Sequence, residues 1–343
     1  MKSCYVSDLK PDQAISTLFL VREKSIRTSA RTGRSWLDLE LADRTGAIAA
    51  KMWDNFEKIT ETFGRDDIVR VRGRVTLYND KNELTLQEII RAGTNDYDLN
   101  DFLPATPQDV EKLFAELQST VAGIRNPWVK KLLESFLGDS TISRELKRAP
   151  AAMTMHHAYL GGLLEHIVSL CGLTKKVAAH YPELDVDLLL AACVLHDIGK
   201  TRELAYERAI AYTDEGHLLG HIVIGLHMVE SKIEAIPGFP APLATLLAHL
   251  IASHHGEYEF GSPKLPACRE AVVFHYLDDL DSKLGAMRVT LETDAGEGDW
   301  TERNPSLRRQ LLRVDRFLAG PAAKGSPPAA SAAAKSAGGA PKK

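Results

Sequence analysis

The stretch LLLAACVLHDIGK, residues 188–200, decides the fold of the second half of this 343-residue chain. Its first eight residues are all apolar, which predicts a helix buried on every side. The run ends in His196, Asp197 and Gly199. A carboxylate there is costly unless a cation or several donors satisfy it, and the adjacent imidazole favours a divalent metal. An isolated His-Asp pair is more often a capping Asp beside a core His. The rest of the chain must therefore decide between that interpretation and a metal site.

The composition excludes several classes of protein. With 44% hydrophobic residues the chain can bury two cores, or one large core with extensions. The net charge of −4 excludes a uniformly basic nucleic-acid-binding coat, so contacts with polyanions need local patches or a metal. The four cysteines are far apart and form no CxxC pair, as is typical of a reducing compartment. Signal-peptide and membrane-span patterns are absent, so we expect a cytoplasmic protein with no membrane partner.

The first part of the chain, residues 1–100, is predicted to be an all-β OB-fold barrel. Five segments have the pattern of strands, and a short helix is expected between the third and the fourth. The strands are predicted at 15–28, 36–43, 46–53, 67–78 and 82–92, and the helix at 55–63. Five strands with a helix in this position follow the order of an OB-fold.

Two strands of this barrel carry candidate nucleic-acid-binding residues. Period-2 geometry puts the three arginines of the fourth strand on one face, and two residues of the third strand face away from its apolar side. The candidates are Lys51, Trp53, Arg70, Arg72 and Arg74. An arginine stripe beside an exposed Trp suits single-stranded nucleic acid, because phosphates take the charge and bases stack on the ring. A solvated edge strand, in a structural or protein-binding barrel, is the alternative.

The rest of the chain is predicted to be helical. We expect a helical linker over 101–150 and an all-α domain over 151–318. Within that domain, helices are predicted at 159–180, 187–195, 220–235, 242–253, 267–286 and 306–318. Residues 319–343 are low in complexity and lack aromatic residues, so they predict a disordered tail.

All twelve histidines fall in the helical part and none in the predicted barrel. Several histidines and two aspartates lie among the apolar residues of predicted helices or directly after such a helix. These residues are His166, His221, His254, His255, Asp278 and Asp281. Imidazole and carboxylate ligands from helix interiors make a mixed nitrogen and oxygen site, which suits manganese, iron, cobalt or zinc better than calcium. The restriction of all twelve histidines to the helical part favours a metal site over a chance distribution.

The order His166, then His196-Asp197, then Asp278 resembles the ligand order of the HD-domain superfamily of metal-dependent phosphohydrolases. A closer resemblance rests on longer segments. These are HHAYLGGLLEH, LHDIGK, GHI, SHHGEYEFGSPKLP and HYLDDLDSK, which follow the predicted OB-fold. In this order they resemble the YhaM-type 3′–5′ exoribonucleases over nearly the whole chain except the tail.

The resemblance implies roles for individual residues. The primary metal ligands would be His166, His196, Asp197 and Asp278, and His221, His254 and His255 would complete the site or bridge to a second ion. Asp197 and Lys200 are the expected catalytic residues, with Lys200 near the substrate phosphate. Mn²⁺ is the first expected ion, with Co²⁺, Fe²⁺, Zn²⁺ and Mg²⁺ as alternatives, and such an ion lowers the pKa of bound water. His157, Glu165 and Asp281 would reach the substrate or support the ligands.

We therefore expect a metal-dependent exonuclease that acts in RNA degradation and removes 5′-mononucleotides from the 3′ end of single-stranded RNA. Single-stranded DNA is a further candidate substrate, and a homo-oligomer is compatible with the sequence. One alternative is an HD phosphohydrolase of nucleotides or cyclic dinucleotides, although no GYP triplet follows the His-Asp motif. The other is a non-catalytic RNA-binding protein in which a metal only holds the helices together.

Overall fold

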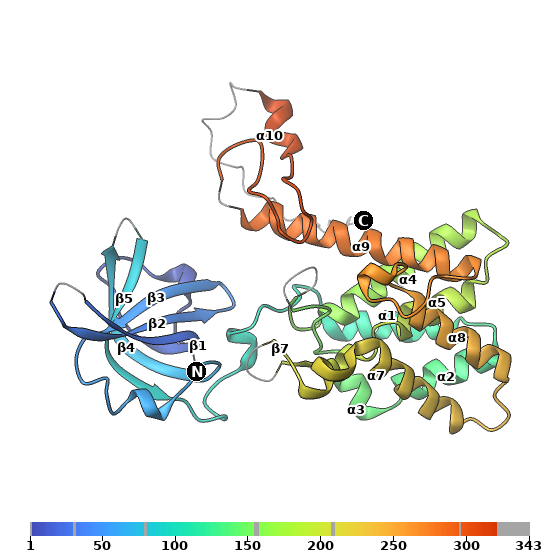
Figure 1. Ribbon diagram of the computed structural model, residues 1–343, viewed down its shortest axis with the longest axis horizontal. Coiled ribbons are helices and arrows are strands. Elements are labelled where there is room, and N and C mark those ends of the chain that lie inside the picture. The colour runs from blue at the N-terminus through green and yellow to red at the C-terminus, as the bar shows by residue number, and fades with distance from the viewer. Residues whose placement is uncertain are drawn as a thin grey trace, which may run out of the picture. The chain divides into compact units, whose positions relative to one another are not determined.

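A five-stranded barrel followed by a helical domain forms the fold of this chain in the computed structural model, as the sequence predicts (Figure 1). The structure describes residues 2–29, 32–78, 81–153, 158–206, 210–294 and 296–320. The described residues up to Gly285 form one compact unit, and those from Ala286 onward form a second. Among the described helices, none combines the length and the apolar composition needed to cross a membrane.

The barrel is closed, and its strands are paired in the order β1-β2-β3-β5-β4. The strands are β1 (Ala14–Thr28), β2 (Ser35–Asp43), β3 (Gly46–Met52), β4 (Ile68–Tyr78) and β5 (Lys81–Arg91). The pairing of β3 with β5 is parallel, and the other four pairings are antiparallel. Strand β1 closes the barrel because it pairs with β4 up to Leu20 and with β2 from Leu20 onward, where a register shift bends it.

The predicted helix over 55–63 is wrong, since the segment contains only the 3₁₀ turn η2 (Thr60–Thr62). Asn55 has a φ of 60°, outside the right-handed helical region. The rings of Phe56 and Phe63 at the two ends are both buried in the barrel core. Tertiary packing of these two rings therefore overrides the helical pattern between them.

Side chains that accept hydrogen bonds from backbone N–H groups set where several helices of the second domain begin. The remaining elements of the chain are η1 (Val6–Asp8), η3 (Leu99–Asp101), α1 (Val110–Ala122), α2 (Pro127–Leu137), α3 (Ser140–Leu146), α4 (Gly162–His180), α5 (Val186–Leu195), α6 (Lys200–Glu203), β6 (Leu204–Ala205), β7 (Ala211–Tyr212), α7 (Asp214–Glu234), α8 (Ala241–Ser253), η4 (Tyr258–Phe260), α9 (Arg269–Thr293) and α10 (Val314–Ala319). Asp109, Asn126, Asp139 and Asp185 cap α1, α2, α3 and α5 with their side chains.

Helix α5 is buried along its length, as the apolar stretch predicts. Every residue from Asp187 to Leu195 is buried, and α5 contacts α2, α4 and α8. Asp187 is satisfied because its Oδ2 accepts hydrogen bonds from the backbone N–H groups of Arg125 and Asn126, at 3.0 and 2.7 Å. This carboxylate ties the α1–α2 connection to α5, which fixes the helix whose end carries His196.

The second unit has a small core of its own, formed by Ala286, Leu307 and Leu311. The helix predicted over 306–318 is wrong in its first half, because the helical part of this segment is α10, which begins at Val314. Arg308 has a φ of 54°, and the backbone of Thr301 pairs with Leu311. Residues 321–343 of the predicted tail lie outside the described residues.

Candidate metal centre

Seven predicted ligands from five helical elements lie close together. They are His166 on α4, His196 and Asp197 directly after α5, His221 on α7, His254 and His255 directly after α8, and Asp278 on α9. Two sets have ligand atoms within 4.8 Å of one another, namely His166 with His196 and Asp197, and His221 with His254 and His255. The structure therefore brings the whole predicted ligand set to one place.

Asp197 connects the two sets. Its Oδ1 lies 3.4 Å from Nε2 of His221 and 3.8 Å from Nε2 of His254. Its Oδ2 lies 3.2 Å from Nε2 of His196 and 2.6 Å from Nζ of Lys200. The two oxygens thus face different partners, and Oδ1 is directed at the second set of imidazoles.

Each of the five imidazoles has an acceptor within hydrogen-bond distance of its Nδ1. The acceptors are Oδ2 of Asp281 for His166 (2.8 Å), the carbonyls of Ala192 and Cys193 for His196 (3.1 and 3.2 Å), Oε1 of Glu203 for His221 (3.1 Å), the carbonyl of Ile251 for His254 (2.7 Å) and the carbonyl of Phe260 for His255 (2.8 Å). Carbonyl and carboxylate oxygens only accept, so Nδ1 carries the hydrogen. Nε2 is then left as the metal-binding atom of each neutral ring.

The donor set fits a divalent cation. Among the described residues, the buried Nε2 atoms of His196 and His221 and the buried Oδ1 of Asp197 have no hydrogen-bond partner. Such atoms lose free energy on burial unless a ligand compensates them. Because they are imidazole nitrogens and a carboxylate oxygen, a first-row divalent ion suits them.

A close approach of two helices explains Gly199. A Cβ at this position would overlap the carbonyl oxygen of His221 and lie 2.7 Å from the backbone nitrogen of Gly225. Only a glycine lets the turn after α5 pack against the α7 backbone here. The glycine therefore brings Asp197 and His221 within reach of the same ion.

We expect Gly199→Ala to lower the free energy of unfolding by about 3 kcal/mol, because two backbones must separate. Urea unfolding followed by circular dichroism measures this. Gly172→Ala is the matched control, because a Cβ added at this position would have no other atom within 4 Å. Gly172 lies inside α4, where alanine favours the helix, so this variant should be more stable than wild type by up to about 1 kcal/mol. Equal stability of Gly199→Ala and wild type would contradict the close-approach argument.

A kink in α7 directs His221 into the centre. Gly220 has a φ of 71° and a ψ of 159°, which interrupts the helix just before His221. The interruption frees the N–H of His221, which donates to Oε1 of Glu203 at 2.9 Å. Glu203 therefore both caps the second half of α7 and holds the imidazole of its first residue.

Burial and neighbouring charges set the protonation of the centre. Burial alone would raise the pKa of Asp197, but His196, Lys200 and His221 together hold this pKa well below its usual value. Burial and the neighbouring imidazoles lower the pKa of His254, and burial together with His221 lowers the pKa of His255. Both rings are thus neutral at neutral pH, as metal ligands must be.

His166 is the exception among the imidazoles. Burial alone would lower its pKa, but the carboxylates of Asp278 and Asp281, with atoms 3.1 and 2.8 Å from its ring nitrogens, raise the pKa to about 9. In the metal-free protein this ring is therefore protonated at pH 7. Its charge stabilises the metal-free fold fully below pH 6.5, and that contribution is lost as the pH rises through about 9.

Metal binding is expected to displace about one proton from His166 at pH 7. The apparent affinity should consequently rise nearly tenfold per pH unit between pH 7 and 8 and level off above about pH 9. Isothermal titration calorimetry in buffers of different ionisation enthalpy measures both the released proton and the affinity. An affinity that stays constant from pH 7 to 9 would contradict the protonated state.

Comparisons with known proteins decide the family. Residues 20–91 match the family described as OB-fold nucleic acid binding domain, and residues 163–283 match the HD domain family. The 3′-5′ exoribonuclease YhaM of Bacillus licheniformis is 37% identical over 287 residues, which cover 83% of this chain and 90% of that protein. Its namesakes from Bacillus velezensis and Bacillus pumilus are 36% and 34% identical, covering 89% and 88% of this chain and 96% and 95% of those proteins. The chain belongs to the YhaM family.

The resemblance noted in the sequence is thereby confirmed for both domains of this YhaM-family chain. The roles of the individual ligands stay predictions. Among the supporting residues, Asp281 contacts Nδ1 of His166 and also accepts a hydrogen bond from Ser169. Glu165 accepts hydrogen bonds from Thr106 and Tyr159, so it ties α4 to the preceding chain. His157 lies outside the described residues.

The predicted nucleic-acid-binding residues of the YhaM-family barrel form two separate groups. Arg70, Arg72 and Arg74 share one face of β4, but β5 lies between β4 and the strand β3 that leads to Trp53. The arginine stripe and Trp53 are therefore not on adjacent strands, because alternation gives the face of a residue and not the order of strands. Their joint role in nucleic-acid binding stays a prediction. Lys51 is paired with Glu83 at 2.6 Å.

Sequence reasoning missed partners in both domains. Trp53 contacts Trp36, with ring centroids 5.2 Å apart, and the guanidinium of Arg34 lies 5.4 Å from its ring. Both partners come from β2 or the residue before it, so only the β2–β3 pairing reveals them. The sequence also did not predict that Glu203 supports His221. The only hint in the sequence is its place as an acidic residue four positions after Gly199.

Proposed function

We propose that this YhaM-family chain is a metal-dependent 3′–5′ exoribonuclease that hydrolyses single-stranded RNA to 5′-mononucleotides. Family membership supports the reaction class. The observation that carries the metal dependence is the convergence of Nε2 atoms whose rings are fixed by acceptors at Nδ1. The OB-fold domain supports a polymeric nucleic-acid substrate.

The chemistry of the site follows from the charges of its residues. A divalent cation held there would lower the pKa of water and neutralise charge on the phosphoryl oxygens. Asp197 has a pKa far below neutrality, so its carboxylate orients the attacking water as a hydrogen-bond acceptor. Burial alone would lower the pKa of Lys200, but the charge of Asp197 raises it, so Lys200 stays cationic and suits a phosphate oxygen beside Asp197.

Finer features of the proposal rest on the sequence. We propose Mn²⁺ as the working ion and one or two ions per chain, because the donors are mixed nitrogen and oxygen. The domain limits 1–100, 101–150 and 151–318, action on DNA, self-association and a cytoplasmic location stay predictions.

A time course with 5′-labelled single-stranded RNA tests the proposal. The reaction is run with Mn²⁺, with Mg²⁺ and with EDTA, and the products are resolved on a sequencing gel. We expect a ladder that shortens from the 3′ end only when metal is present. RNA labelled at its 3′ end should release labelled mononucleotide from the first time point. Intact RNA in every metal would contradict the proposal, and nucleoside triphosphates and cyclic dinucleotides would then be the substrates to assay.

A further inference from the structure

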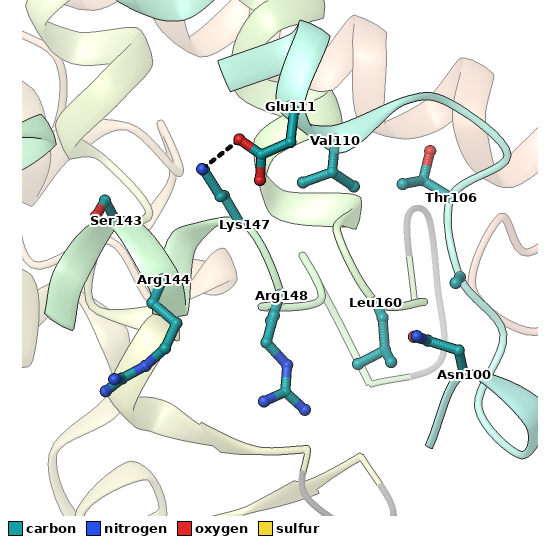
Figure 2. A pocket seen from close by; sticks show the side chains of 10 residues that line it. Asn100, Thr106, Val110, Glu111, Ser143, Arg144, Lys147, Arg148 and Leu160 are labelled. Carbon is teal, nitrogen blue, oxygen red and sulfur yellow. Dashed lines mark hydrogen bonds and ion pairs between the residues drawn. The ribbon is translucent and has the colours of Figure 1, made fainter. Parts of the chain in front are cut away.

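A hollow of about 610 Å³ lies between the segment that follows the barrel and the end of α3, and none of its lining residues is a predicted metal ligand (Figure 2). One wall is the segment that follows the barrel, from Asn100 to Glu111. The other is the C-terminal part of α3 and the residues just after it, with Leu160 between the two walls. The first wall is held in place because the backbones of Pro104 and Thr106 hydrogen-bond to Leu160, at 2.8 and 2.9 Å.

Three cations line this hollow, and among the described residues only Lys147 has a counter-ion. Nζ of Lys147 lies 2.6 Å from Oε2 of Glu111. Figure 2 shows the side chains of Arg144 and Arg148 extending together in another direction, away from that pair. Within the described part of the chain, neither guanidinium has an ion pair or a side-chain hydrogen bond. Two neighbouring positive charges that no described residue compensates, in a protein of net charge −4, favour an anionic ligand.

The hollow is connected to the metal centre through a short chain of contacts. Thr106 lines the hollow, and its hydroxyl donates to Oε2 of Glu165 at 2.5 Å. Glu165 directly precedes His166 in the first turn of α4. A ligand in the hollow therefore lies against the same structural support that positions a predicted metal ligand.

The residue types in the hollow favour a phosphodiester backbone. Guanidinium groups bind phosphate oxygens through paired hydrogen bonds, and Ser143, Thr106 and Asn100 add neutral donors. None of the described lining residues carries an aromatic ring on which a base could stack. Contacts to phosphate alone carry no sequence information, which suits an enzyme that shortens RNA of any sequence.

We propose that Arg144 and Arg148 hold backbone phosphates of the RNA substrate, on the 5′ side of the nucleotide that is removed. This inference rests on the proposed exoribonuclease function. Each phosphate contact to a single strand contributes about 0.7 to the slope of log affinity against log salt. Loss of both arginines should lower the slope by about 1.4 and weaken binding about 25-fold at 0.1 M salt.

Fluorescence anisotropy with a 5′-labelled single-stranded RNA 20-mer tests this. The full chain and Arg144→Ala/Arg148→Ala are titrated in EDTA at several salt concentrations, with oligo(A) and with oligo(U). Both arginines are exposed, and equal thermal melting checks that the variant folds. The matched control is Lys131→Ala/Lys176→Ala, which removes the same charge from exposed positions of α2 and α4 outside the hollow.

We expect a reduced slope for the arginine variant with both RNAs, and an unchanged slope for the lysine control. If the arginine variant keeps the wild-type slope, or if the lysine control loses as much, the inference is wrong. The proposed function is tested separately by the ladder from 3′ shortening by the wild type. A wild type that shortens RNA while the slope stays unchanged rejects only the inference, and a wild type that neither shortens nor binds RNA rejects both.

Discussion

Replacing Asp197 by Asn should lower the turnover number on single-stranded RNA by a factor on the order of 10³ while the protein stays folded. The oxygens of Asp197 approach His196, His221 and His254 together. Asn keeps the volume but removes the charge and one acceptor oxygen. Breaking the buried pair with Lys200 should also cost about 3–5 kcal/mol of stability, which a domain of this size tolerates.

Three measurements separate a catalytic centre from a structural one. They are steady-state hydrolysis, circular dichroism melting and metal content, each compared with Asp279→Asn, which removes a charge from an exposed ion pair with Lys283 on the same helix as Asp278. A metal that only holds the helices together predicts that EDTA unfolds the wild type as well. A folded and fully active Asp197→Asn would show that hydrolysis occurs elsewhere.

Replacing Glu203 by Ala should weaken metal binding about 10- to 100-fold. Oε1 of Glu203 accepts hydrogen bonds from both the backbone nitrogen and Nδ1 of His221, at 2.9 and 3.1 Å. Burial alone would raise the pKa of Glu203, but its hydrogen bonds to His221 lower the pKa, so the carboxylate is ionised at neutral pH. Without it, the ring of His221 loses its orientation and part of its basicity.

Two further variants show which property of Glu203 matters. Gln at position 203 keeps an acceptor oxygen, so Glu203→Gln should lose less affinity than Glu203→Ala in calorimetric titrations. Glu215→Ala removes an exposed carboxylate from the start of α7 and should leave the affinity unchanged. If Glu203→Ala binds metal as tightly as wild type, orientation by Glu203 is unimportant.

Sequence alone predicted the features that depend on local pattern. The uninterrupted apolar run gave the buried helix α5, and long motifs gave a ligand set that the fold gathers from five helical elements. The supporting atoms could not be predicted, because three of the five imidazoles are held by backbone carbonyls that any residue supplies. The role of Glu203 depends on the kink at Gly220. The sequence predicts a helix that begins at Gly220, whereas α7 begins at Asp214 and is interrupted at Gly220.

The wrong predictions have a common physical reason, namely that the position of a neighbour is set by tertiary structure. Residues 55–63 have helical propensity, yet two buried rings fix them in another conformation. In the barrel, alternation predicted correctly that Arg70, Arg72 and Arg74 share a face. It could not reveal that Trp53 contacts Trp36 instead, because strand order depends on how the barrel closes.

The acceptors at Nδ1 of the five imidazoles have a consequence for how the protein obtains its metal in a cell. The rings are oriented by the helical scaffold before any ion arrives, so loading needs no folding step, unlike that of a zinc finger. A rigid nitrogen and oxygen site of this kind follows the Irving–Williams order, which ranks copper and zinc above manganese. Which ion fills such a site therefore depends on cellular supply. If the proposed Mn²⁺ is the working ion, the protein purified from a zinc-rich medium should carry zinc until it is stripped and reloaded.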